Sequence, residues 1–161
     1  MKKKKKYRPR DIRLNIVEYV LSGMKPLREM KDIYLSVQIL NREALDKVRT
    51  GTATKDDIDR LIGAFNFTEA LALQGLGADW LPEINQAQDA LLELARRGVE
   101  NNMRFIMTSQ QWEMMKLMME LHEEQLAKAT VYDIEKAYDV VQKTIRQRKV
   151  RTVIQPRKEM S

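Results

Sequence analysis

The sequence contains no cysteine and only one histidine among its 161 residues. The absence of cysteine excludes disulfide bonds, cysteine nucleophiles and thiolate-bound zinc or iron–sulfur sites, and is consistent with a reducing cytoplasm. A single histidine, His122, excludes metal sites built from several imidazoles. A chain of this length needs neither kind of support, because it buries roughly 68–70% of its unfolded surface on folding. We therefore expect no metal and no cofactor.

Long uncharged hydrophobic runs are also missing. The most apolar stretch, residues 61–78, contains Glu69 together with polar residues and three glycines, so it favours a buried central helix over a membrane span. The lysines at residues 2–6 resemble the start of a signal peptide, but charged residues interrupt the segment that follows. The sequence therefore predicts a cytoplasmic protein that has no contact with a membrane.

Apolar residues recur at spacings of three and four along most of the chain, and strand patterns are nearly absent. Glycine and proline, together with the predicted caps Thr54, Thr108 (or Ser109) and Thr130, divide this pattern into six predicted helices. They cover residues 12–22, 27–49, 54 to about 74, about 81 to Gly98, 110–128 and 131–149. We expect an all-α fold in which residues 11–149 form one compact domain, residues 1–10 a basic flexible arm and residues 150–161 a basic flexible tail.

Residues 99–108 and the last predicted helix each depart from the average pattern of the chain. Residues 99–108 are the least helical part of the chain, and whether Phe105 to Thr108 are extended stays open. The last helix has the most regular alternation of three and four residues. Its predicted buried stripe consists of Val131, Ile134, Tyr138, Val141 and Ile145.

The net charge of +6 is unevenly distributed. Residues 1–10 carry +7 and residues 143–161 carry +6, whereas residues 11–142 carry −7. Only the two ends could attract phosphates, because a nucleic-acid-binding face should be basic. The predicted nucleic-acid-binding residues are Lys3, Lys4, Lys5, Lys6, Tyr7, Arg8, Arg10, Arg146, Lys149 and Arg151. The alternative is that both ends only keep the protein soluble.

The charge pattern argues against a helix-turn-helix as the element that reads nucleic acid. The turn at Gly51 would place the following helix in the major groove, and that helix begins with Asp56, Asp57 and Asp59. Three carboxylates at this position would repel the phosphates. The sequence instead favours dipole complementation at a helix N-terminus for these aspartates.

Methionine is concentrated in one segment. Six of the ten methionines lie between residues 103 and 119, and on the predicted fifth helix they cover two adjacent stripes. One stripe suffices for a core, so the second indicates either central packing or a docking surface for a partner, where the flexibility of methionine is useful. The candidate partner-binding residues are Trp112, Met115, Met118, Met119 and His122.

His122 does not complete any catalytic motif. A zinc-protease helix requires a second histidine four residues later, and that position is Leu126. No nucleophile has a fixed relation to His122, so we expect a packed or interfacial histidine, no catalytic residues and no enzymatic activity.

Four phrases of the sequence, KKKYRPR, YVLSGMKPL, TGTATKDDIDRLIGAFNFTEAL and LHEEQLAKATVYDIEKA, carry a resemblance that spans nearly the whole chain. The chain resembles short helical proteins encoded in phages and prophages of Gram-negative bacteria, most of which have no assigned function. The resemblance implies a bacterial cytoplasm and a mobile-element setting. It supplies no catalytic residues.

Two hypotheses from different classes follow. In the first, the chain is a non-enzymatic accessory protein of a phage or mobile element that contacts nucleic acid through its basic termini. In the second, its acidic, methionine-rich body docks on a host or defence complex as an inhibitor or adaptor, for example against a defence system. A two-fold homodimer would bring four basic ends together and bury the methionine stripe.

Overall fold

The computed structural model describes residues 31–146, where five α-helices and one short 3-10 helix follow one another and no strand occurs. They are α2 (Lys31–Thr50), α3 (Lys55–Leu73), η3 (Ala78–Trp80), α4 (Leu81–Glu100), α5 (Ser109–Lys128) and α6 (Val131–Arg146). The all-α class is confirmed. The predicted helix at residues 12–22, the basic arm, the basic tail and any end of the last helix beyond residue 146 lie outside the described residues.

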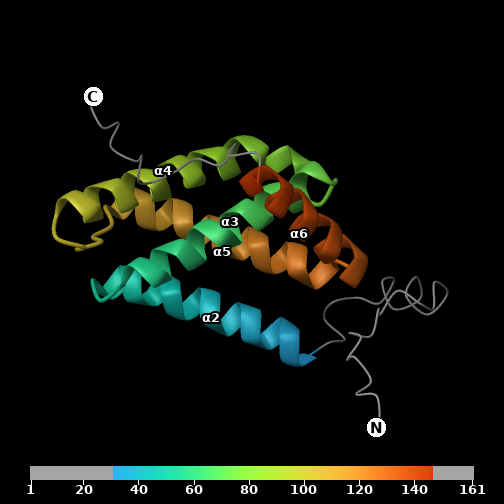
Figure 1. Ribbon diagram of the computed structural model, residues 1–161, viewed down its shortest axis with the longest axis horizontal. Coiled ribbons are helices and arrows are strands. Elements are labelled where there is room, and N and C mark those ends of the chain that lie inside the picture. The colour runs from blue at the N-terminus through green and yellow to red at the C-terminus, as the bar shows by residue number, and fades with distance from the viewer. Residues whose placement is uncertain (1–30, 147–161) are drawn as a thin grey trace, which may run out of the picture.

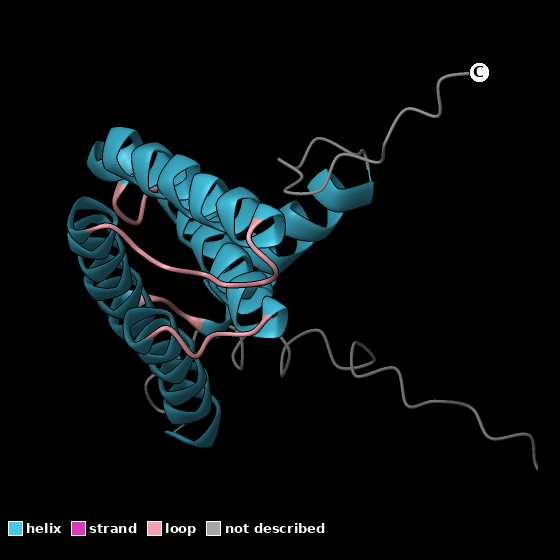
Figure 2. Cartoon of the chain, turned by 90° about the vertical axis from the view of Figure 1, so that its left-hand side faces the viewer, coloured by secondary structure: helices cyan, strands magenta, loops and turns pink. Residues whose placement is uncertain are grey.

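The central element is α3, which packs against α2, α4, α5 and α6. Figure 1 shows α3 and α5 crossing each other between α2 and α4, with α6 lying against α3. Figure 2 looks onto the end of the molecule where α2 connects to α3 and α4 connects to α5. We call α2 to α5 the four-helix body and treat α6 separately.

The body is held together by one large apolar core. Its fully buried side chains come from all four helices, and α3 contributes on several of its sides because other helices surround it. Representative members are Val48 of α2, Phe65 of α3, Leu94 of α4 and Met115 of α5, each at most 1% exposed. These positions recur every three or four residues, as predicted for helices that face a common core.

The helix starts follow local capping chemistry. Thr54 precedes α3, and its amide N–H donates to the Asp57 carboxylate at 2.8 Å. Burial alone would raise the pKa of Asp57, but the hydrogen bonds from Thr54 and the nearby Lys47 ammonium hold it below its ordinary value. Thr130 and Asp133 form the equivalent pair at α6. These threonine caps were predicted from the sequence.

The prediction that Gly98 ends α4 is wrong. Gly98 is a buried residue inside α4, which continues to Glu100. A Cβ atom at Gly98 would clash with Cδ1 of Phe105, so glycine is needed here to let the Phe105 ring approach the helix backbone. The turn that follows uses Asn102 and Met103, both in the left-handed region with φ of 56° and 62°. Phe105 to Thr108 do not form a strand.

The predicted stripe of α6 is also corrected at one position. Tyr138 is 52% exposed, whereas its neighbour Ala137 is fully buried. A small residue lies where α6 packs against α3, and the tyrosine ring lies at the edge of this contact, with its centroid 6.3 Å from that of the Phe67 ring. Ile134 and Val141 pack on this contact as predicted. Over residues 31–146, no helix is long and apolar enough to cross a membrane.

Candidate functional site

Of the predicted nucleic-acid-binding residues, Arg146 alone falls within the described part of the chain. It is exposed in the last turn of α6, together with Lys143. Cations are favoured at this helix end because the carbonyl groups there carry the negative end of the helix dipole. Lys3 to Arg10, Lys149 and Arg151 lie outside the described residues.

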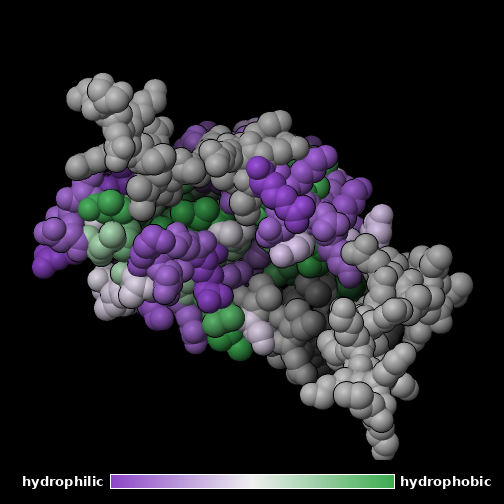
Figure 3. Space-filling view, in the orientation of Figure 1, coloured by the Kyte–Doolittle hydropathy of each residue, from purple (hydrophilic) through white to green (hydrophobic). Residues whose placement is uncertain are grey.

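The described residues are acidic as a group. Residues 31–146 contain 14 basic and 19 acidic side chains, a net charge of −5, while residues 1–30 carry +7 and residues 147–161 carry +4. The folded part therefore does not share the basic character of the whole sequence. Figure 3 shows mixed hydrophilic and hydrophobic surface on one face of this part.

The structure places the predicted partner-binding residues mainly inside the body. Met115, Met118, Met119 and His122 are at most 4% exposed, and Trp112 is half-buried. Both methionine stripes are used internally because α5 packs against α2, α3 and α4. In the folded chain these four side chains offer very little surface to a partner, and Trp112 is the most accessible of the five predicted residues.

His122 belongs to a buried polar cluster that joins α5 to α3. Its Nδ1 lies 2.9 Å from the Thr68 hydroxyl, and the Gln125 amide donates to the backbone carbonyls of Thr68 and Leu76 at 2.9 and 2.8 Å. Burial lowers the pKa of His122 to about 4, although a hydrogen bond to Gln125 opposes the shift. The imidazole is neutral at physiological pH and shielded from solvent, which supports a structural role.

A cleft of about 370 Å³ separates α2 from the first half of α5. Its apolar lining comes from Leu45, Trp112 and Met119, and its charged lining from Arg42, Asp46, Lys116 and Glu120. The lining residue Arg42 forms a bidentate ion pair with Glu123, in which its guanidinium donates to both carboxylate oxygens at 2.6 and 2.7 Å.

The cations around this cleft already have partners. The Glu123 hydrogen bond and charge raise the pKa of Arg42, so the guanidinium stays charged. Lys116 lies 5.6 Å from the centroid of the Trp112 ring and 3.1 Å from Glu113. Among the described residues Glu120 forms no ion pair, and it is exposed at the rim.

The loop between α4 and α5 is held in one conformation by contacts at both ends. Phe105 is buried against Gly98, and the Arg97 guanidinium donates to the Ile106 carbonyl and to the Gln111 amide oxygen. Gln111 also completes a capping box with Thr108, with reciprocal hydrogen bonds of 3.0 and 3.1 Å.

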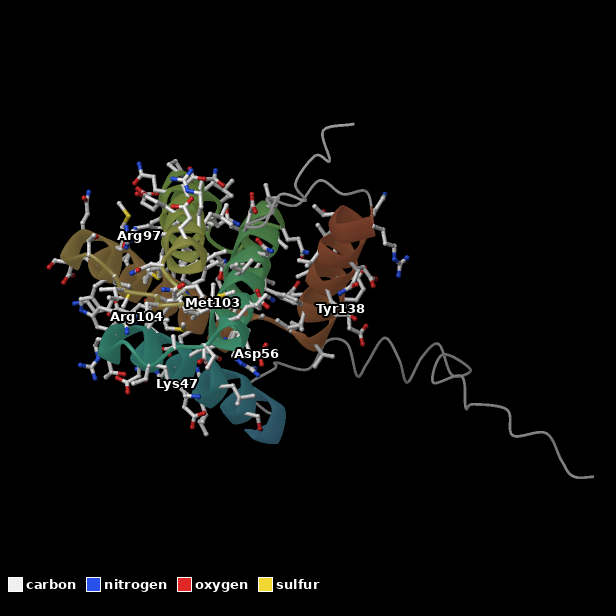
Figure 4. The ribbon with its side chains drawn as sticks, turned by 60° about the vertical axis from the view of Figure 1, so that its left-hand side comes forward. Lys47, Asp56, Arg97, Met103, Arg104 and Tyr138 are labelled. Carbon is white, nitrogen blue, oxygen red and sulfur yellow. The ribbon has the colours of Figure 1, made fainter. Side chains whose placement is uncertain are left out.

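The same loop displays apolar side chains to solvent. Met103 is 49% and Ile106 58% exposed, and Arg104 lies exposed between them in the sequence. Figure 4 shows Met103, Arg97 and Arg104 at the same end of the molecule as Lys47 of α2, and apolar surface is visible at this end in Figure 3. We call residues 101–107 the α4–α5 loop.

The sequence did not reveal the cleft or the anchoring of the loop. Arg42 and Glu123 are 81 residues apart, and no local pattern links them. Thr108 was one of two predicted caps for the fifth helix, but its pairing with Gln111 and the link from Gln111 to Arg97 were not predicted. Over residues 31–146, no group of three or more histidine, cysteine or acidic residues could hold a metal ion.

Comparison with known proteins adds no functional assignment. No family model matches this sequence, and neither a curated protein nor a solved structure is significantly similar to it.

Proposed function

We propose that this protein contacts nucleic acid through its basic terminal segments, and that helices α2 to α6 form an acidic scaffold from which these segments extend. The supporting observation is the separation of charge, with −5 on residues 31–146 and +7 and +4 on the residues before and after them. Phosphates are repelled by the scaffold and attracted by its ends, which restricts contact to those ends.

The exposed end of α6 supports this arrangement at one of the two sites. Lys143 and Arg146 lie in its last turn, immediately before the segment that contains Lys149 and Arg151. Arginine binds phosphate in a forked geometry and lysine as a point charge, so this mixture suits the backbone of a nucleic acid rather than one base sequence. The role fits an accessory protein of a phage or mobile element in a bacterial cytoplasm.

The test is binding of the full-length chain to fluorescent duplex and single-stranded oligonucleotides at several salt concentrations. If about six phosphates are neutralised, log K falls with log salt concentration at a slope of about −5 on duplex DNA. Removal of residues 1–10 and 150–161 should reduce both the affinity and the slope.

A matched control changes charge on the scaffold. Arg60 and Arg96 are exposed on α3 and α4, and their replacement by serine removes two cations without touching the termini. This variant should bind within about twofold of the unmodified chain. Equal binding by the doubly truncated chain, or an affinity that does not change with salt, would show that the basic ends are not the contact.

The alternative is that the acidic scaffold docks on a basic surface of a host or defence complex. Its support is the same negative charge, since the methionines that were expected to anchor it are buried. Affinity capture from bacterial lysate, with and without nuclease, separates the two functions. A specific protein complex that persists after nuclease treatment and is lost on charge reversal of scaffold carboxylates would favour this alternative.

A further inference from the structure

We propose that two copies of this chain associate by inserting the α4–α5 loop of each copy into the α2–α5 cleft of the other. This interface is independent of the nucleic-acid contact proposed above. It rests on two features of the described residues that match in shape, polarity and charge: a fixed loop that exposes apolar side chains, and an open cleft with an apolar lining.

The loop is strained and nevertheless fixed. Met103 has a φ of 62°, a backbone conformation that residues with a Cβ atom rarely adopt and that is energetically unfavourable for methionine. The buried Phe105 and the Arg97 hydrogen bond to the Ile106 carbonyl hold this conformation. A loop that is ordered before binding loses little conformational entropy on association. The strained backbone therefore presents Met103 and Ile106 outward at low further cost.

The α2–α5 cleft has an apolar lining and enough volume for side chains of the loop. The apolar lining available to the two exposed side chains of the loop comes mainly from the half-buried Trp112, and Leu45 and Met119, which are 7% and 4% exposed, add smaller areas. Methionine, tryptophan and arginine are enriched at protein interfaces, and all three types meet in this arrangement. A volume of about 370 Å³ accommodates the ends of two side chains rather than a whole helix.

The charged side chains of the cleft indicate which residue of a second copy could pair with it. Arg42 is committed to Glu123, and Lys116 to Trp112 and Glu113. Glu120 attracts Arg42 through its charge and contributes to the raised pKa of Arg42, but it forms no ion pair among the described residues. The cleft therefore offers a carboxylate to an incoming cation. Arg104, which forms no ion pair over residues 31–146, is that cation in the second copy.

The position of both features permits a two-fold arrangement. The α4–α5 loop leads directly into α5, and Trp112 lies one turn after the start of that helix. Loop and cleft are therefore neighbours at the same end of the body. A rotation axis at this end would place each loop on the opposite cleft, so that the contact forms twice and closes.

The experiment is sedimentation of the full-length, nuclease-treated chain over a wide concentration range at a salt concentration that suppresses tail contacts. We expect a monomer–dimer equilibrium. In a Trp80→Phe background, Trp112 becomes the single tryptophan, and its emission should shift to shorter wavelength as dimer forms and water leaves the cleft.

Met103→Asn separates association from folding. Asparagine tolerates the left-handed conformation better than methionine, so the variant should unfold at the same or a higher temperature than the original chain. It also removes the apolar side chain from the loop, so the dimer dissociation constant should rise about tenfold or more. A structural role for Met103 alone would not produce these opposite changes.

A charge exchange tests the pairing of loop and cleft directly. Arg104→Glu and Glu120→Arg should each weaken the dimer, and the double variant should recover most of the affinity because the two charges are exchanged. Leu73→Glu is the matched control, since Leu73 is 64% exposed on α3 and outside both features. A chain that stays monomeric at several hundred micromolar, or a dimer unaffected by Met103→Asn and by both charge reversals, would overturn the proposal.

Discussion

The four-helix body and α6 are both amphipathic, yet they differ greatly in how they are held. The core of the body contains 17 buried apolar residues contributed by the body's helices and the α4–α5 loop. The cluster beneath α6 contains three, Ala70, Leu71 and Ala137, of which α6 supplies one. Apolar residues are confined to one side more clearly in α6 than in α5, although α5 is the more deeply buried helix. Apolar periodicity therefore reports on which side a helix is covered, and it does not report how deeply the helix is buried.

This difference between the body and α6 predicts that replacing a large side chain by alanine lowers the free energy of unfolding more in the body than in α6. Phe65→Ala removes a fully buried ring from α3 and should lower the free energy of unfolding by about 3–5 kcal/mol. Ile134→Ala removes a partly buried side chain of α6 and should cost about 1–2 kcal/mol. Urea unfolding followed by circular dichroism measures both changes.

Hydrogen exchange sharpens the same comparison. The amides of α6 should exchange through a local opening that leaves the body folded, because within residues 31–146 the main packing of α6 is against α3. Ile134→Ala should accelerate exchange in α6 and leave the amides near Phe65 unchanged. Equal protection in α6 and α3, or equal losses from the two truncations, would show that the two regions form one cooperative unit.

Acid should weaken the body through His122. The pKa of His122 is about 4 in the folded chain and about 6.5 when unfolded, so folding favours the neutral imidazole. This contribution is fully present above pH 6.5 and is lost as the pH falls from 6.5 towards 4. The total loss is about 3 kcal/mol. The free energy of unfolding, measured from pH 7.5 to 4.5, should fall by most of this amount.

His122→Gln is the control for this pH dependence. The variant loses the Thr68 contact and is less stable at neutral pH, but its stability should change much less between pH 6.5 and 4.5. Asp57 also loses stabilisation in acid, although at lower pH because its pKa lies below the ordinary carboxyl value. An unchanged slope in His122→Gln would mean that the imidazole is not the group that titrates.

The sequence predicted the class of fold and most helix ends, because these depend on local chemistry. Thr54, Thr108 and Thr130 each start a helix where a threonine cap was expected. How deeply a side chain is buried, and which distant residue it contacts, depend on residues far apart in the chain. The burial of Met118 and the ion pair between Arg42 and Glu123 are set by how α5 packs against three other helices, and no local pattern contains that information.

Two glycines of the body should respond to alanine with opposite signs. Gly98→Ala places a methyl group against the Phe105 ring and should lower the free energy of unfolding by about 1–3 kcal/mol. Gly63 lies in the interior of α3 with nothing within 4 Å of an added Cβ. Gly63→Ala should therefore raise the free energy of unfolding by about 0.5–1 kcal/mol. Thermal unfolding of both variants measures the contrast, and a stabilising Gly98→Ala would contradict the close approach of Phe105.

The smallest expected effect concerns the ion pair that joins α2 to α5. The Arg42 side chain is 66% exposed and that of Glu123 18%, so solvent screens much of their attraction despite the two-pronged geometry. A double-mutant cycle with Arg42→Gln and Glu123→Gln should give a coupling of about 0.5–1 kcal/mol, and 1 M salt should reduce it. The pair joins α2 to α5 beside the cleft, so its loss should loosen α2 from α5 more than it lowers global stability. Faster hydrogen exchange in α2, with exchange in α4 unchanged, is the expected result. A coupling near zero with unchanged exchange in α2 would mean that apolar packing alone holds these two helices together.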